Sequence, residues 1–99
     1  MARPVPARTR IGAERIGDHL AAWRKLQQLT AAQVAERAGV SRGTLRNLEN
    51  GATSVGLDVV LNVARVLGVL DRIVEAFDPY ETDLGRTRAD EKLPQRVRP

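Results

Sequence analysis

Two arginines and two asparagines near the middle of the chain are spaced so that one face of a helix would carry them all. Arg42 and Arg46 are four residues apart and would project side by side, with Asn47 and Asn50 on the same outer face. A guanidinium group can donate two hydrogen bonds to guanine, and a carboxamide can bind adenine in a similar way. Gly43 would let the backbone approach a ligand closely, at a cost of about 1 kcal/mol in helix propensity. This face could therefore read base edges, and a solvated polar face without a ligand is the alternative.

The sequence around these residues predicts a pair of short helices joined by a tight turn. Thr30 is a good N-cap residue, and Gln33 completes a capping box with it. Gly39 can adopt the left-handed conformation that the turn needs, and Ser41 can cap the second helix. Helices this short are marginal alone, so they must be held by packing on a core. The residues expected to provide that packing are Val34, Ala35, Ala38, Val40, Leu45 and Leu48.

Apolar periodicity predicts an all-α fold with five helices and no strand. The helices are expected at about 13–28, 31–38, 42–50, 56–67 and 70–77. The inner face of the first is predicted to hold Ile16, Leu20, Trp23 and Leu26. That of the fourth is predicted to hold Leu57, Val60, Leu61, Ala64 and Leu67. Pro79 prevents the fifth helix from continuing.

The distribution of charge and proline predicts three zones. Residues 1–11 are expected to form a flexible basic arm, residues 12–77 the helical domain, and residues 78–99 a polar C-terminal tail. Of the net charge of +4, residues 1–16 hold +3. A segment with this excess could contact phosphate groups, and a disordered leader without a ligand is equally compatible.

The composition argues against several other classes of protein. The chain has no cysteine and a single histidine, His19, so we expect no metal site and no cofactor. No apolar run is long enough to span a bilayer, and the lack of cysteine fits a cytoplasmic protein. No nucleophile elbow, phosphate-binding loop or acid–base pair is recognisable, so we do not expect an enzyme.

Residues 16–70 resemble the XRE family of helix-turn-helix regulators, which includes the lambda-like phage repressors. The matching positions are Arg24, Leu29-Thr30, Ala35, Gly39-Val40-Ser41, Leu45, Glu49-Asn50-Gly51, Leu57, Val60, Val63-Ala64 and Leu67. The resemblance implies a five-helix lambda-repressor-like domain that binds double-stranded DNA as a homodimer.

The resemblance also implies roles for individual residues. Arg42, Gly43 and Asn47 match base-contacting positions, and Arg46 matches the next position outward. Thr44 and Asn50 match positions that often hold the phosphate backbone, while Arg24 and Glu49 match a partly buried structural ion pair. The chain departs from the pattern in two places. Ala31 stands where the family has a phosphate-binding glutamine, and Val55 stands where it has a proline.

The function predicted from these observations is a dimeric transcriptional repressor that binds a pseudo-palindromic operator. The fourth and fifth helices are a candidate dimer surface through Leu70, Ile73, Val74 and Phe77, which could equally belong to the core. The tail loosely resembles those of HipB-type antitoxins. The alternative function is therefore an antitoxin that neutralises a kinase-like toxin protein and regulates its own operon. The tail could equally be a disordered, mixed-charge segment with no dedicated partner.

Overall fold

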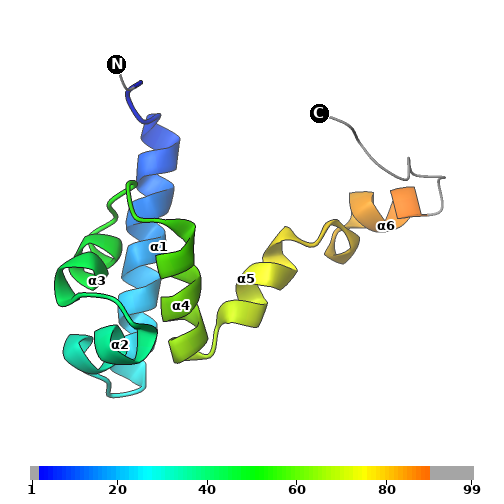
Figure 1. Ribbon diagram of the computed structural model, residues 1–99. Helices are drawn as coiled ribbons and strands as arrows, with labels where there is room; N and C mark the ends of the chain where they lie inside the picture. The colour runs from blue at the N-terminus through cyan, green and yellow to red at the C-terminus, as the bar shows by residue number, and fades with distance from the viewer. Residues whose placement is uncertain (1–2, 90–99) are drawn as a thin grey trace.

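The computed structural model describes residues 3–89, which form six α-helices and one 3-10 helix without any strand (Figure 1). The elements are α1 (Ala7–Leu26), α2 (Ala31–Ala38), α3 (Arg42–Glu49), α4 (Leu57–Leu67), α5 (Leu70–Phe77), η1 (Pro79–Glu81) and α6 (Asp83–Ala89). The expected all-α fold is confirmed, and α6 adds a helix to the five expected. Met1 and Ala2 of the expected arm and residues 90–99 of the expected tail lie outside the described residues.

The caps at the start of α2 and α3 are the ones that the sequence predicts. The Thr30 side chain accepts a hydrogen bond from the Gln33 amide at 3.1 Å, and the Gln33 side chain accepts one from the Thr30 amide at 2.8 Å. Gly39 ends α2 in the left-handed conformation, with φ of 70°. The Ser41 hydroxyl oxygen accepts from the Thr44 amide at 3.0 Å and so begins α3. These local interactions fix the turn between the two helices.

Helices α1 to α4 enclose one aliphatic core, and we call them the body. Its most deeply buried large side chains are Val34, Leu45 and Val63, from α2, α3 and α4. The other buried apolar residues are Leu20, Ala35, Ala38, Leu48, Ala64, Leu67 and Val69. Three side chains predicted to face inward do not, because Ile16, Leu26 and Leu57 are 51%, 77% and 70% exposed. The core thus contains fewer side chains of α1 and α4 than the apolar periodicity predicted.

Helix α1 begins at Ala7, so the expected start near residue 13 is wrong. Pro6 occupies the N-cap position, where a proline ring interferes with no helical hydrogen bond, and residues 7–11 of the expected arm form the first turns. At 20 residues α1 is the longest helix in the described part of the chain. Among residues 3–89 there is no helix with the length and apolar character needed to cross a membrane.

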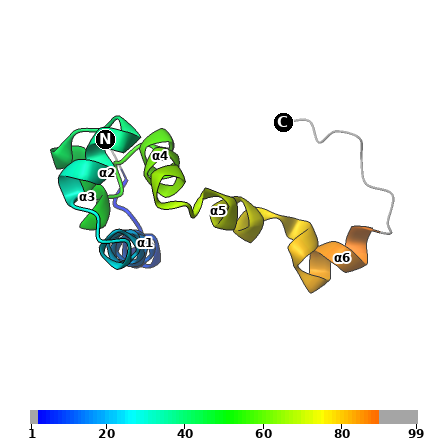
Figure 2. The same cartoon turned by 90° about the horizontal axis from the view of Figure 1, so that it is seen from below.

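Helices α5 and α6 extend away from the body, and we call residues 70–89 the C-terminal arm (Figures 1 and 2). Helix α5 packs on α4, and α6 packs on η1. The Arg72 guanidinium lies 5.5 Å from the centre of the Trp23 ring and links α5 to α1. The radius of gyration is 16.6 Å, larger than the roughly 13 Å of a compact domain of this length. The arm therefore adds length to the molecule, and only its start adds to the core: Leu70 and Ile73, two of the four residues of the candidate dimer surface, are half-buried and pack against it.

Candidate nucleic-acid interface

Helix α3 turns its apolar side chains inward and its polar ones outward. Leu45 and Leu48 are 0% and 4% exposed, and they fix the rotation of the helix on the body. The opposite face carries four of the predicted site residues, Arg42, Arg46, Asn47 and Asn50, and all four are exposed, as is Gly43. A Cβ atom added at Gly43 would meet only the Ser41 hydroxyl, at 3.9 Å. The space outside the helix start is therefore open to a ligand.

Thr44, predicted from the resemblance to contact phosphate, is half-buried beside the helix cap. Its hydroxyl oxygen accepts a hydrogen bond from the Ser41 hydroxyl at 2.9 Å. The Thr44 hydroxyl hydrogen then remains available to donate to another group. Thr44 thus lies at the N-terminal end of α3, where backbone N–H groups also favour an anion.

The ion pair that the resemblance implies between α1 and α3 is present. Arg24 donates from Nε and Nη2 to the two carboxylate oxygens of Glu49, at 2.8 and 2.9 Å, and from Nη1 to the Leu29 carbonyl at 3.2 Å. Both side chains of the pair are 14% exposed. The hydrogen bond to Glu49 raises the pKa of Arg24 above its ordinary value, outweighing the opposite effect of burial. The pair braces α3 against α1 and neutralises the only acidic side chain of α3.

Two glycines bring α1 close to α3. From the sequence alone, Gly17 was not singled out, and Gly51 matched the family pattern without a prediction of this contact. A Cβ at Gly17 would lie 2.5 Å from the Leu48 carbonyl oxygen and 2.6 Å from that of Glu49. A Cβ at Gly51, where φ is 85°, would lie 2.6 Å from Cα of Glu14. Any larger residue at either position would push the backbones of α1 and the end of α3 apart. For Gly17 the signal available in the sequence was a glycine within a helical pattern, which often has a packing reason.

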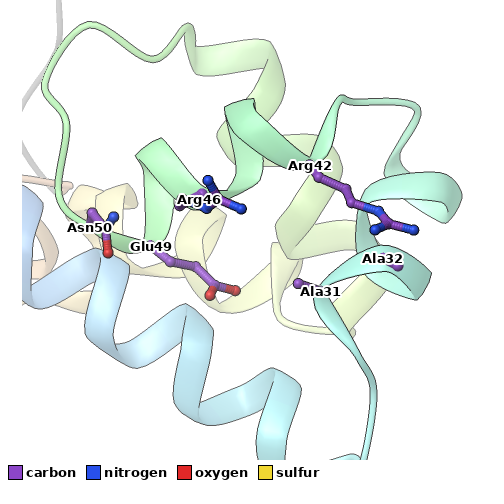
Figure 3. A pocket seen from close by; sticks show the side chains of 6 residues that line it. All are labelled: Ala31, Ala32, Arg42, Arg46, Glu49 and Asn50. Carbon is purple, nitrogen blue, oxygen red and sulfur yellow. The ribbon is translucent and has the colours of Figure 1, made fainter.

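A hollow of about 270 Å³ opens between the start of α2 and the outer face of α3 (Figure 3). It is lined by Ala31, Ala32, Arg42, Arg46, Glu49 and Asn50. Arg42 extends toward the start of α2, and Arg46 follows it along α3 (Figure 3). Ala31 is the departure from the family pattern noted above, and its short side chain contributes to the space.

The charges around this face favour a polyanion. Arg42 and Arg46 contribute two positive charges, while Glu49 is neutralised by Arg24. The expected basic arm holds three arginines, Arg3, Arg8 and Arg10, which are all exposed and do not line the hollow; the last two lie on the first turns of α1. The site can thus offer bidentate donors to base edges and positive charge to phosphates.

Comparison with known proteins identifies the class of domain. Residues 15–77 match the model of a protein family described as a helix-turn-helix domain, in agreement with the resemblance to XRE-type regulators. No curated protein and no solved structure gives a significant match. The match covers well over half of the chain, so the chain belongs to this helix-turn-helix family and is a DNA-binding regulator.

Proposed function

We propose that this member of the helix-turn-helix family is a transcriptional repressor that binds a pseudo-palindromic operator as a homodimer. Helix α3 enters the major groove, and α2 lies across the phosphate backbone, as in other proteins with this motif. The role is binding without catalysis. The observation that carries the proposal is the pair of exposed guanidinium groups, Arg42 and Arg46, on a short helix whose other face is fully buried.

Because α3 is held in a fixed position, Arg42 and Arg46 can distinguish one base pair from another. Base readout needs donors that are held within hydrogen-bonding geometry of one base pair and not of its neighbours. Leu45 and Leu48 fix the rotation of α3, and the Arg24–Glu49 pair fixes its distance from α1. Arg42 and Arg46 then need to order only their own side chains to bind guanine.

The remaining site residues divide by the group that each would contact. Asn47 follows Arg46 on the outer face and suits adenine, while Gly43 gives the backbone room near the groove. Thr44 and Asn50 lie toward the two ends of α3, where the phosphate backbone would pass. Phosphate contacts fix the register of the protein on the duplex, and base contacts select the sequence.

A single α3 can read only a few base pairs, so a second copy is needed for a specific site. Two α3 helices related by a twofold axis would read half-sites about 34 Å apart, or one turn of the double helix. The operator would then be a pseudo-palindrome with a half-site spacing of about ten base pairs.

Selection of bound DNA from a random pool tests this proposal. The full chain is incubated with the pool at a fixed salt concentration, because phosphate contacts make any affinity salt-dependent. We expect the enriched sequences to share two inverted half-sites that contain guanine. Enrichment of no common sequence would refute the proposal.

An antitoxin is the second candidate, and the exposed apolar side chains of the C-terminal arm favour it. Phe77 and Leu84 are 83% and 67% exposed, and a toxin protein could cover them. Co-purification with a kinase-like protein encoded beside this chain would support this candidate. Equal recovery of that protein by the full chain and by a variant that lacks residues 78–99 would exclude the tail as its binding site.

A further inference from the structure

One side of helix α1 meets α3, and Arg10 lies on that side beyond the point of contact. Gly17 of α1 adjoins the backbone at the end of α3, and Glu14 adjoins Gly51 directly after α3. Arg10 precedes Gly17 by seven positions and Glu14 by four, so the helical repeat places it on the same side. It lies about 6 Å further along the helix than Glu14. Arg10 is therefore positioned past the C-terminal end of α3, on the part of α1 that extends beyond the body (Figure 1).

The neighbouring arginines of α1 lie on its other side. Each residue turns an α-helix by about 100°, so Arg8 and Arg15 are about 160° and 140° around α1 from Arg10. All three side chains are exposed. Within residues 3–89, Arg10 makes no ion pair and no side-chain hydrogen bond. Its guanidinium group is thus available to a ligand that lies against α3, and those of Arg8 and Arg15 are not.

We propose that Arg10 binds a phosphate group of the DNA backbone beside the C-terminal end of α3. The inference rests on the proposed entry of α3 into the major groove and adds a residue of α1 that fixes the position of the protein on the duplex. From the sequence, the whole basic segment could either contact phosphate or have no ligand. The fold assigns the contact to one arginine in an ordered helix.

The C-terminal end of α3 and the loop after it contribute no positive charge of their own. Residues 47–56 hold a single charged side chain, Glu49, which Arg24 neutralises. The end of a helix also carries a partial negative charge, which repels phosphate. The start of α3, by contrast, has Arg42 and backbone N–H groups that favour an anion. Arg10 supplies at the far end of α3 the positive charge that this end lacks.

The stability of α1 does not account for an arginine at this position. Helix α1 has no acidic residue in its first turn, and a positive charge near a helix N-terminus opposes the helix dipole. Glu14, four residues after Arg10, is exposed and is the less favourable order for such a pair. An exposed pair of this kind contributes little in any case. A phosphate contact gives Arg10 a role that folding does not.

The experiment compares Arg10→Ala with Arg8→Ala, which removes the same charge from the other side of α1. Fluorescence anisotropy measures binding of the full chain to a labelled duplex of random sequence at several salt concentrations. We expect Arg10→Ala to weaken binding about tenfold and to lower the salt slope by about one unit for each bound chain. Arg8→Ala should weaken binding less than about twofold and keep the slope, because its charge is screened from the duplex. Arg10→Lys should also keep the slope, because it keeps the charge.

Thermal unfolding separates binding from folding. Both alanine variants should unfold at the wild-type temperature or slightly above it, because each removes a charge that opposes the dipole of α1. Weaker binding by an Arg10→Ala chain that unfolds at a clearly lower temperature would assign Arg10 to folding and overturn the proposal. Equal losses of affinity and slope for Arg8→Ala and Arg10→Ala, or no loss for Arg10→Ala, would also overturn it.

The proposed function is judged by a different result. If selection from a random pool enriches no common sequence, base reading by α3 fails, while the slopes on the random duplex still decide for or against Arg10. On a selected operator, ethylation of single phosphates locates the contact. We expect one phosphate in each half-site whose ethylation weakens binding of the wild type and not of Arg10→Ala. The same interference pattern for both proteins would contradict the contact.

Discussion

Helices α3 and α5 are each eight residues long and amphipathic, yet they use their two faces in opposite ways. Helix α3 buries Leu45 and Leu48 in the body and presents polar side chains to solvent. Helix α5 has no fully buried residue and presents Val74 and Phe77 instead. The difference shows how the two helices can serve different partners. A helix that buries its whole apolar face in the core holds its polar side chains in fixed positions. A helix that leaves apolar side chains exposed needs a further protein surface to cover them.

The largest expected contrast between the two helices is in stability. Leu45→Ala removes a side chain that is 0% exposed and should lower the free energy of unfolding by about 2–5 kcal/mol. Phe77→Ala removes a larger side chain that is 83% exposed, and in the monomer it should change that free energy by less than about 0.5 kcal/mol. Urea unfolding at a concentration too low for dimers compares the two. A Phe77→Ala loss as large as that of Leu45→Ala would mean that the arm folds back onto the body.

The close approach of α1 and α3 gives the next largest effect. Gly17→Ala places a methyl group where the Leu48 carbonyl oxygen is 2.5 Å away, and it should cost about 1–3 kcal/mol of unfolding free energy. Gly12→Ala on the same helix is the control, because a Cβ there meets nothing within 4 Å. It should stabilise α1 by up to about 1 kcal/mol. Thermal unfolding of both variants should show shifts of opposite sign, and equal shifts would argue against the tight crossing.

The two ion pairs test the same contrast at a smaller scale. Glu49→Ala leaves the Arg24 guanidinium, 14% exposed, without its carboxylate and should cost about 1–3 kcal/mol of stability. Asp83→Ala breaks the exposed pair on the arm and should have no measurable effect. A double-mutant cycle with Arg24→Ala measures the coupling in the body. Strictly additive losses would show that the Arg24–Glu49 contact does not brace α3.

The smallest effect concerns the hollow beside α3. Ala31→Gln restores the side chain that the family pattern has at this position, in a space of about 270 Å³. One added phosphate contact should strengthen binding equally for all DNA sequences, by about 1 kcal/mol, and leave the salt dependence unchanged, because the glutamine side chain is uncharged and displaces no counterion. Titrations at several salt concentrations measure both. A change in base preference instead would place residue 31 near the bases.

Local signals made the helix-turn-helix unit predictable from the sequence. Thr30, Gly39 and Ser41 act through hydrogen bonds and backbone conformation within four residues, so the limits of α2 and α3 followed from them. The outward residues of α3 followed from the helical repeat, once the apolar face was known. The ion pair between Arg24 and Glu49 came from the resemblance alone, since nothing in their separation of 25 positions indicates contact.

The packing of α1 was not predictable in the same way. Apolar periodicity placed Ile16 and Leu26 inward, but the face of α1 that meets the body uses Gly17 and Arg24, which that method does not count. The start of α1 was missed because the prolines before Ala7 argued for an irregular arm. The direction of the arm depends on how α5 packs after Gly68. From the sequence alone, the apolar residues of α5 could belong either to the core or to an interface.

The most direct test of the proposed recognition by α3 is the binding energy of a selected operator in which each base pair is replaced in turn. The profile is measured for the wild type and for Arg46→Ala at one salt concentration. In the variant we expect a loss of about 1–3 kcal/mol in affinity and a flat response at one base pair in each half-site, with all other positions unchanged. Identical profiles for the two proteins would contradict base reading by α3.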